Sequence, residues 1–109
     1  MSNDYDVRYE IRSQHVISNV EADSLVAEIR AAGYLYSEEA SKPMTDFEIV
    51  DDEQVFTIDG MTALYGEAPE EAHKKINSII QTKVDPHATV ITRWHICTGW
   101  EWGEEFGEG

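Results

Sequence analysis

The chain has 109 residues, enough for one domain with a modest core, and 41% of them are hydrophobic, as in a folded rather than a disordered chain. It carries 22 Asp and Glu against 8 Lys and Arg, a net charge of −14, which disfavours binding to nucleic acid or to an anionic membrane because both require a basic surface. Short apolar runs, an amino terminus without a secretory signal and a single cysteine, Cys97, predict a cytoplasmic protein with no membrane-spanning helix and no internal disulfide.

The first two elements have clear sequence signatures. Residues 5–11 alternate apolar and charged side chains, which predicts a half-buried strand that runs on toward residues 16–17. Ser18 and Glu21 then have the spacing of a capping box, which predicts that a helix begins here. Gly33 suits the carboxyl-terminal cap of that helix. Its apolar residues follow helical spacing: Ala22, Leu25, Val26, Ile29 and Ala32.

The middle of the chain predicts two short strands joined by an acidic turn. After a loop over residues 34–44, the strands are expected at residues 46–50 and 54–58. The turn between them lacks an Asn-Gly or Asp-Gly pair, so the sequence does not define its length. Asp59-Gly60 is expected to end the second strand, and residues 60–66 to form a loop.

The last two predicted elements are a helix and a long strand. The helix is expected to begin near residues 68–71, where a proline and two glutamates suit the first turn, and to end before Asp85-Pro86. Its buried stripe is expected to be Ala72, Ile76, Ile79 and Ile80. Residues 88–102 then alternate as in a strand. One face carries Val90, Trp94, Ile96, Trp100 and Trp102, and the other carries Ile91, Arg93, His95 and Cys97.

The predicted order of elements is strand, helix, strand, strand, helix, strand. One compact arrangement of this order is the α+β ferredoxin-like βαββαβ fold, a four-stranded antiparallel sheet with two helices on one face. We therefore expect a single acidic domain over residues 1–109, with residues 103–109 as a flexible acidic tail. The sheet face without helices must then meet solvent, a partner or a second copy of the chain.

No pattern in the sequence predicts catalysis or a metal site. Cys97 and His95 share one strand face and resemble an activated thiol, but no residue pattern supplies the orienting group and oxyanion site that catalysis also needs. The four histidines show no metal-ligand spacing. The acidic turn at residues 51–53 lacks the spacing and the glycine of a calcium loop. We therefore expect no enzyme activity, no metal and no cofactor.

The acidic residues are segregated along the chain. Nine carboxylates lie between Lys42 and Lys74 with no Lys or Arg among them, whereas an ordinary solvated surface mixes both signs. At the carboxyl terminus, Trp100 is interpreted as core, while Trp102 and Phe106 are interpreted as aromatic anchors rimmed by carboxylates. The predicted partner-binding residues are Asp46, Glu48, Asp51, Asp52, Glu53, Asp59, Glu67, Glu70, Glu71, Glu101, Trp102, Glu104, Glu105 and Phe106.

These carboxylates indicate a binding protein whose partner is basic. Alternate residues of a strand repeat about every 6.6 to 6.8 Å, so acids on a sheet can approximate an array of phosphates. In size, charge and predicted fold the chain resembles phage-encoded DNA mimics, and that resemblance implies a non-enzymatic inhibitor of the basic nucleic-acid-binding surface of a restriction or CRISPR complex. The alternative is a protein-interaction module without nucleic-acid mimicry, such as an immunity protein or an accessory subunit that dimerises through the open sheet face.

Overall fold

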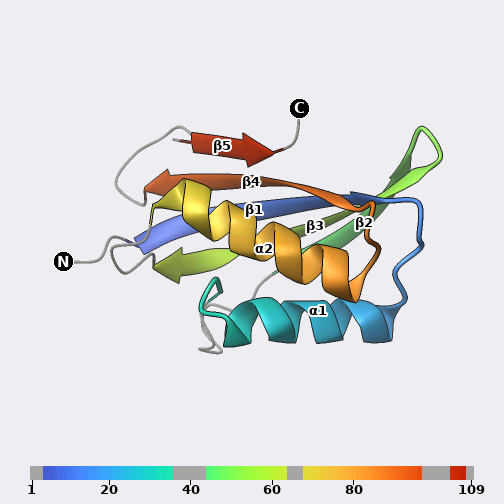
Figure 1. Ribbon diagram of the computed structural model, residues 1–109, viewed down its shortest axis with the longest axis horizontal. Helices are drawn as coiled ribbons and strands as arrows, with labels where there is room; N and C mark the ends of the chain where they lie inside the picture. The colour runs from blue at the N-terminus through green and yellow to red at the C-terminus, as the bar shows by residue number, and fades with distance from the viewer. Residues whose placement is uncertain (1–3, 36–43, 64–67, 97–103, 108–109) are drawn as a thin grey trace.

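The computed structural model describes residues 4–35, 44–63, 68–96 and 104–107, and it shows an α+β domain with an antiparallel sheet and two helices (Figure 1). The strand order across the sheet is β2-β3-β1-β4-β5. None of the helices in these segments is long and apolar enough to cross a membrane. The elements are β1 (Asp4–Ser13), α1 (Asn19–Ala31), β2 (Met44–Val50), β3 (Glu53–Ala63), α2 (Pro69–Lys83), β4 (Thr89–Ile96) and β5 (Glu104–Gly107).

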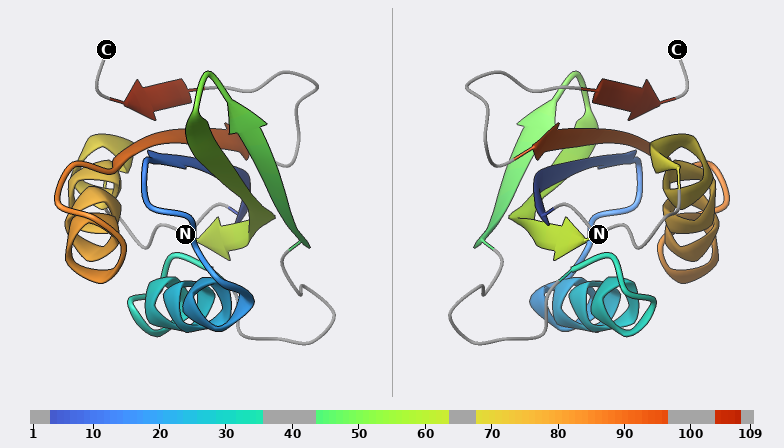
Figure 2. Two further views of the ribbon diagram at one scale, coloured as in Figure 1. Left: turned by 90° about the vertical axis from the view of Figure 1, so that its right-hand side faces the viewer. Right: turned by 90° about the vertical axis from the view of Figure 1, so that its left-hand side faces the viewer.

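Both helices contribute to one hydrophobic core, which lies on a single face of the sheet. Leu25 and Ile29 of α1 and Ile76 and Ile80 of α2 are buried in the same cluster as alternate residues of β1, β3 and β4. Figure 2 views the molecule along its long axis and shows both helices on one side of the twisted sheet. The fully buried strand residues of this cluster include Val7, Tyr9, Ile11, Phe56, Ile58, Val90 and Trp94. The predicted four-stranded antiparallel sheet with two helices is therefore present.

Strand β3 is longer than the sequence predicted. Asp59-Gly60 does not end it, and residues 60–63 continue the strand instead of forming a loop. The reason is the partner strand, because β1 pairs with β3 over its whole length, from Ser13 opposite Gln54 to Asp4 opposite Ala63. Pairing with a ten-residue neighbour overrides the local tendency of a glycine to end a strand.

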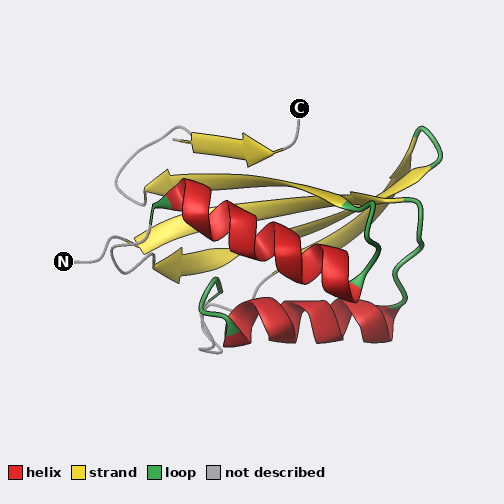
Figure 3. Ribbon diagram, in the orientation of Figure 1, coloured by secondary structure: helices red, strands yellow, loops and turns green. Residues whose placement is uncertain are grey.

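Four residues of the predicted acidic tail form a short strand. Strand β4 ends at Ile96, and residues 104–107 form β5, which pairs antiparallel with β4 (Figure 3). This strand is held by backbone pairing with β4, so a polar, glycine-rich segment gives no local sign of it. The predicted continuation of β4 through Trp100 to Trp102 lies outside the described residues.

Helix α1 begins and ends as its sequence predicted. Ser18 and Glu21 form both hydrogen bonds of the capping box, each 3.2 Å long. At the other end the N–H of Tyr34 donates to the carbonyl of Ile29 and the N–H of Gly33 donates to the carbonyl of Arg30, which is the Schellman pattern. Gly33 has a φ of 94°, a left-handed backbone angle that residues other than glycine adopt only at an energetic cost.

Two side chains of the sheet donate hydrogen bonds to the backbone that follows α1. Tyr9 of β1 is fully buried, and its hydroxyl donates to the carbonyl of Tyr34 over 2.6 Å. Thr62 of β3 donates its hydroxyl to the carbonyl of Gly33 over 3.0 Å. Burial raises the pKa of the Tyr9 phenol far above its ordinary value. These two hydrogen bonds hold the carboxyl-terminal turn of α1 against β1 and β3.

Candidate functional site

The two strands β2 and β3 form a hairpin whose two-residue turn is Asp51-Asp52. Both residues have positive φ, 51° and 65°. Two consecutive left-handed residues define a type I′ turn, which suits the twist of antiparallel strands and strongly favours Asn-Gly. Figure 1 shows the tip of this hairpin extending past the ends of both helices. The acidic turn that the sequence predicted is therefore a tight, protruding corner.

The carboxylates of β2 lie on the sheet face that carries no helix. Asp46 pairs with Thr57 of β3, and Glu48 pairs with Val55. These β3 residues lie opposite Glu10 and Arg12 of β1, which alternate with the buried core residues. Asp46 and Glu48 are both exposed. They are therefore displayed side by side, with the spacing of alternate strand residues, about 6.6 to 6.8 Å.

The carboxylates of the hairpin have no basic partner in the described part of the chain. Among the described residues, no ion pair or side-chain hydrogen bond engages this group. Residues 46, 48, 51 and 52 are exposed and residue 53 is partly exposed. We call this group the hairpin carboxylates: Asp46, Glu48, Asp51, Asp52 and Glu53.

Asp59 does not belong to this group. It lies farther along β3, and its Oδ1 accepts a hydrogen bond of 2.6 Å from Nε of Arg8 on β1. That hydrogen bond raises the pKa of the Arg8 guanidinium. Both side chains are about two-fifths exposed, 38% for Arg8 and 41% for Asp59, so solvent screens the pair and its net contribution to stability is small. A carboxylate already paired in this way is a poor contact for a basic partner.

The centre of the open sheet face carries charges of both signs, because Glu10 lies between Arg8 and Arg12 on that face of β1. Arg8 of β1 lies directly opposite Arg93 of β4, and Arg12 lies on the same face of β1. Ile91 of β4, on the same face, is partly buried. The backbone of His95 continues β4, whereas Cys97 lies outside the described residues. The open face is therefore mixed in charge, and Asp46 and Glu48 lie at its β2 edge.

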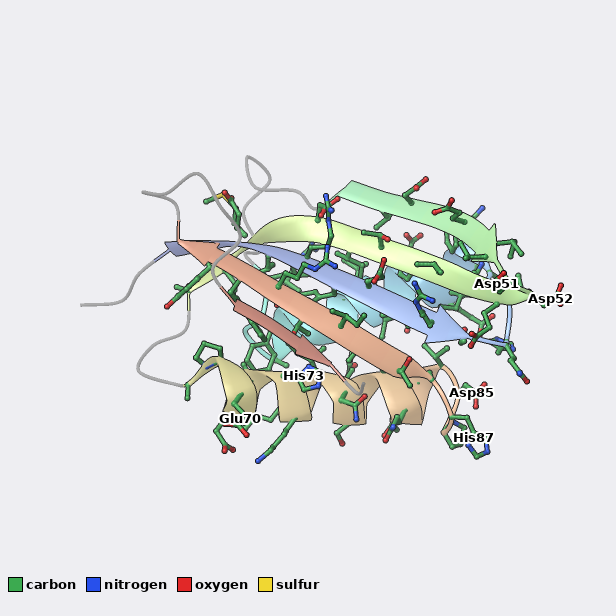
Figure 4. All side chains as sticks on the ribbon, turned by 90° about the horizontal axis from the view of Figure 1, so that it is seen from above. Asp51, Asp52, Glu70, His73, Asp85 and His87 are labelled. Atoms are coloured by element: carbon green, nitrogen blue, oxygen red, sulfur yellow. The ribbon has the colours of Figure 1, made fainter. Side chains whose placement is uncertain are left out.

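The predicted acids at the start of α2 form a separate surface. In Figure 4, Glu70 lies at the amino-terminal end of α2, and Asp51 and Asp52 lie at the other end of the molecule. Glu70 and Glu71 are exposed in the first turn of the helix, and Glu71 lies 3.6 Å from Nζ of Lys74. They do not adjoin the hairpin, because β3 runs the length of the sheet between the two sets. Their position favours a role in stabilising the positive end of the helix dipole.

The carboxyl-terminal candidates are placed only in part. Glu104, Glu105 and Phe106 lie in β5, where the backbone of Glu105 pairs opposite Arg93 and that of Phe106 opposite Thr92. Their side chains lie outside the described part of the chain, as do all of Glu67, Glu101 and Trp102. Residues 104–107 therefore form a fifth strand at the β4 edge of the sheet, opposite the β2 edge.

Two exposed residues of the hairpin, and a third residue at the same end of the molecule, are not among the predicted contacts. Phe47 and Ile49 of β2 are 38% and 65% exposed, although they alternate with the acids as core residues do. Phe47 stacks on the buried Phe56 with 4.7 Å between ring centroids. Figure 4 shows Asp85 at the same end of the molecule as Asp51 and Asp52. Asp85 lies in the Asp-Pro turn after α2, where its Oδ1 accepts a hydrogen bond of 2.9 Å from the N–H of His87, and nothing local in the sequence shows which end of the domain that turn occupies.

Two of the histidines each contact a different side chain. His15 lies 2.9 Å from Glu21, and His73 lies 3.1 Å from the hydroxyl of Thr92. In the described segments no three His, Cys, Asp or Glu side chains are arranged to hold a metal ion. The His15 hydrogen bond, followed by those from Ser18, lowers the pKa of Glu21.

Comparison of the chain with protein-family models, with curated proteins and with solved structures finds no match.

Proposed function

We propose that this chain is a small acidic binding protein that inhibits a nucleic-acid-binding partner by occupying its basic surface with the hairpin carboxylates. The setting that best suits such a protein is a phage-encoded DNA mimic, acting in the host cytoplasm against a restriction or CRISPR complex. The mechanism is steric and electrostatic and requires no catalysis or cofactor. The order β2-β3-β1-β4, with each helix connecting strands that are not neighbours, supports a ferredoxin-like architecture for this scaffold.

One observation carries the proposal: the protruding hairpin turn is built from two aspartates where its conformation favours Asn-Gly. Both residues are left-handed, and they adjoin further uncompensated acids. Like charges on a hairpin repel one another, and an Asp-Asp turn is less favourable than Asn-Gly. A local choice that lowers stability without a structural gain is typical of a functional site.

The geometry of the hairpin suits a receptor for phosphates. A duplex carries one negative charge per about 1.7 Å of helix axis, counted over both strands. Asp46 and Glu48 repeat at about 6.6 to 6.8 Å along one strand, and the paired strands and the turn hold the whole group in fixed positions. A stiff array loses little conformational entropy on binding, which favours affinity for a preformed basic groove.

The test is capture of host proteins by two variants of equal net charge. Asp46→Asn with Glu48→Gln removes two charges from the hairpin, whereas Glu70→Gln with Glu71→Gln removes two from the other end of the molecule. Immobilised wild-type and variant proteins are exposed to host lysate at about 50 mM and about 200 mM salt, and bound proteins are identified by mass spectrometry. We expect a nucleic-acid-binding protein on the wild type, much less on the hairpin variant and little change on the control.

Two results would contradict the proposal. Equal capture by the hairpin variant would show that the hairpin is not the contact site. Capture that survives high salt and is unaffected by added duplex DNA would favour a protein-interaction module without nucleic-acid mimicry, because a phosphate-like contact weakens steeply as salt rises.

A further inference from the structure

The outer edge of β2 is open to a further strand. β2 is the terminal strand of the sheet, and among the described residues only β3 pairs with it. In a hairpin with a two-residue turn, Val50 and Glu53 form the closing hydrogen-bonded pair, and the pairs then alternate. The backbone groups of Thr45, Phe47 and Ile49 therefore point away from β3, and all three residues are exposed. The edge offers donors and acceptors for β-strand addition.

The two faces of β2 differ in polarity: one is acidic and the other is apolar. On the open sheet face Asp46 and Glu48 present negative charge. On the helix side Phe47 and Ile49 expose apolar surface, and Phe47 is held in place by its stacking on Phe56. A strand added beside β2 has the same alternation of side chains. Its residues would therefore need to be basic on one face and apolar on the other.

A second copy of this chain does not fit the edge. Antiparallel pairing of two β2 strands would bring Asp46 and Glu48 of both copies onto one face, where like charges opposite one another destabilise the pair. Each copy also has a net charge of −14, so the two molecules repel at long range. Charge complementarity instead favours a cationic segment of another protein.

We infer that β2 binds an extended segment of its partner in which basic and apolar residues alternate, and that this segment adds to the sheet as a new edge strand. The inference rests on the proposed function, because it names the part of the partner that the hairpin contacts. Backbone pairing supplies orientation, the acids of β2 select the basic residues, and Phe47 with Ile49 covers the apolar ones.

The test uses two synthetic peptides of identical composition, one that alternates lysine and valine over eight residues and one with four lysines followed by four valines. Amide hydrogen exchange is followed by NMR on the whole protein. We expect the alternating peptide to slow exchange at Thr45, Phe47 and Ile49 by at least tenfold. Asp46 and Glu48, whose amides face β3, should change little. The block peptide should produce a much smaller effect at all of these sites.

A backbone variant provides the matched control. Thr45→Pro removes one outward N–H at an exposed edge position, where proline is compatible with a strand, and Thr45→Val keeps it. We expect the proline variant alone to lose peptide protection while both retain the wild-type fold by circular dichroism. Equal protection by the two peptides, or unchanged protection in Thr45→Pro, would overturn strand addition. Neither result affects competition by duplex DNA, which tests the proposed function separately.

Discussion

Replacing the hairpin turn by Asn-Gly should show separately how much stability the two aspartates cost and how much affinity they contribute. In the variant Asp51→Asn with Asp52→Gly, the second residue no longer carries a Cβ at its φ of 65°. A left-handed conformation costs an ordinary residue about 1–2 kcal/mol and Asp somewhat less, so relief of this strain is worth about 1 kcal/mol. Removal of two repelling charges acts in the same direction. We expect the free energy of unfolding to rise by about 1 kcal/mol and the melting temperature by about 4 °C.

The assay is urea unfolding followed by circular dichroism, with Glu70→Gln and Glu71→Gln as the control of equal net charge. The control should lower stability by about 0.3–1 kcal/mol for each residue, because glutamates in the first turn interact favourably with the helix dipole. The two variants should therefore change stability in opposite directions. If both stabilise the fold equally, general charge repulsion explains the result, and the hairpin turn carries no special strain.

The affinity for the partner should fall in the variant whose stability rises. The more stable Asn-Gly variant is expected to bind the captured partner about tenfold or more weakly, which corresponds to about 1.4 kcal/mol for the two lost charges together. A gain in stability that leaves affinity unchanged would refute the reasoning that these aspartates are retained for binding.

Three further variants test the scaffold. Tyr9→Phe removes the buried hydrogen bond to the carbonyl of Tyr34 and should cost about 1–3 kcal/mol in urea unfolding. Because burial raises the pKa of Tyr9, its contribution should be complete below pH 10 and lost progressively above it, so wild-type stability should fall more steeply than that of Tyr9→Phe in alkaline solution. Ser18→Ala removes the cap of α1 and should cost about 1 kcal/mol. Gly33→Ala should also cost about 1 kcal/mol, entirely through its φ of 94°, because no atom lies within 4 Å of the added Cβ. Unchanged melting temperatures would contradict each assignment.

The elements that the sequence predicted well are those set by local chemistry. The capping box of Ser18 and Glu21 and the glycine after α1 are patterns within a few residues, and the structure contains all of them. The alternation of Tyr5 to Ile11 similarly marks β1, because one face of that strand is buried. Such signals do not depend on which distant segments the chain brings together.

The features that the sequence did not show depend on pairing between distant segments. Gly60 remains in a strand because β1 lies beside it, and Asp59 is neutralised by Arg8, 51 residues away in the chain. The exposure of Phe47 follows from the position of β2 at the sheet edge. The candidate site is therefore one hairpin, which is smaller than the acidic segment that the sequence predicted. Only the fold shows which carboxylates have a basic partner among the described residues and which do not.

Competition by duplex DNA tests the central proposal most directly. The partner captured by the wild-type protein is titrated with duplex DNA at about 50 mM and about 200 mM salt, and the fraction of protein still bound is measured. We expect DNA to displace the protein completely at the lower salt, and the affinity of protein and DNA for the partner to fall together as salt rises. Simultaneous binding of DNA and protein to the same partner would show that the hairpin does not occupy a nucleic-acid site.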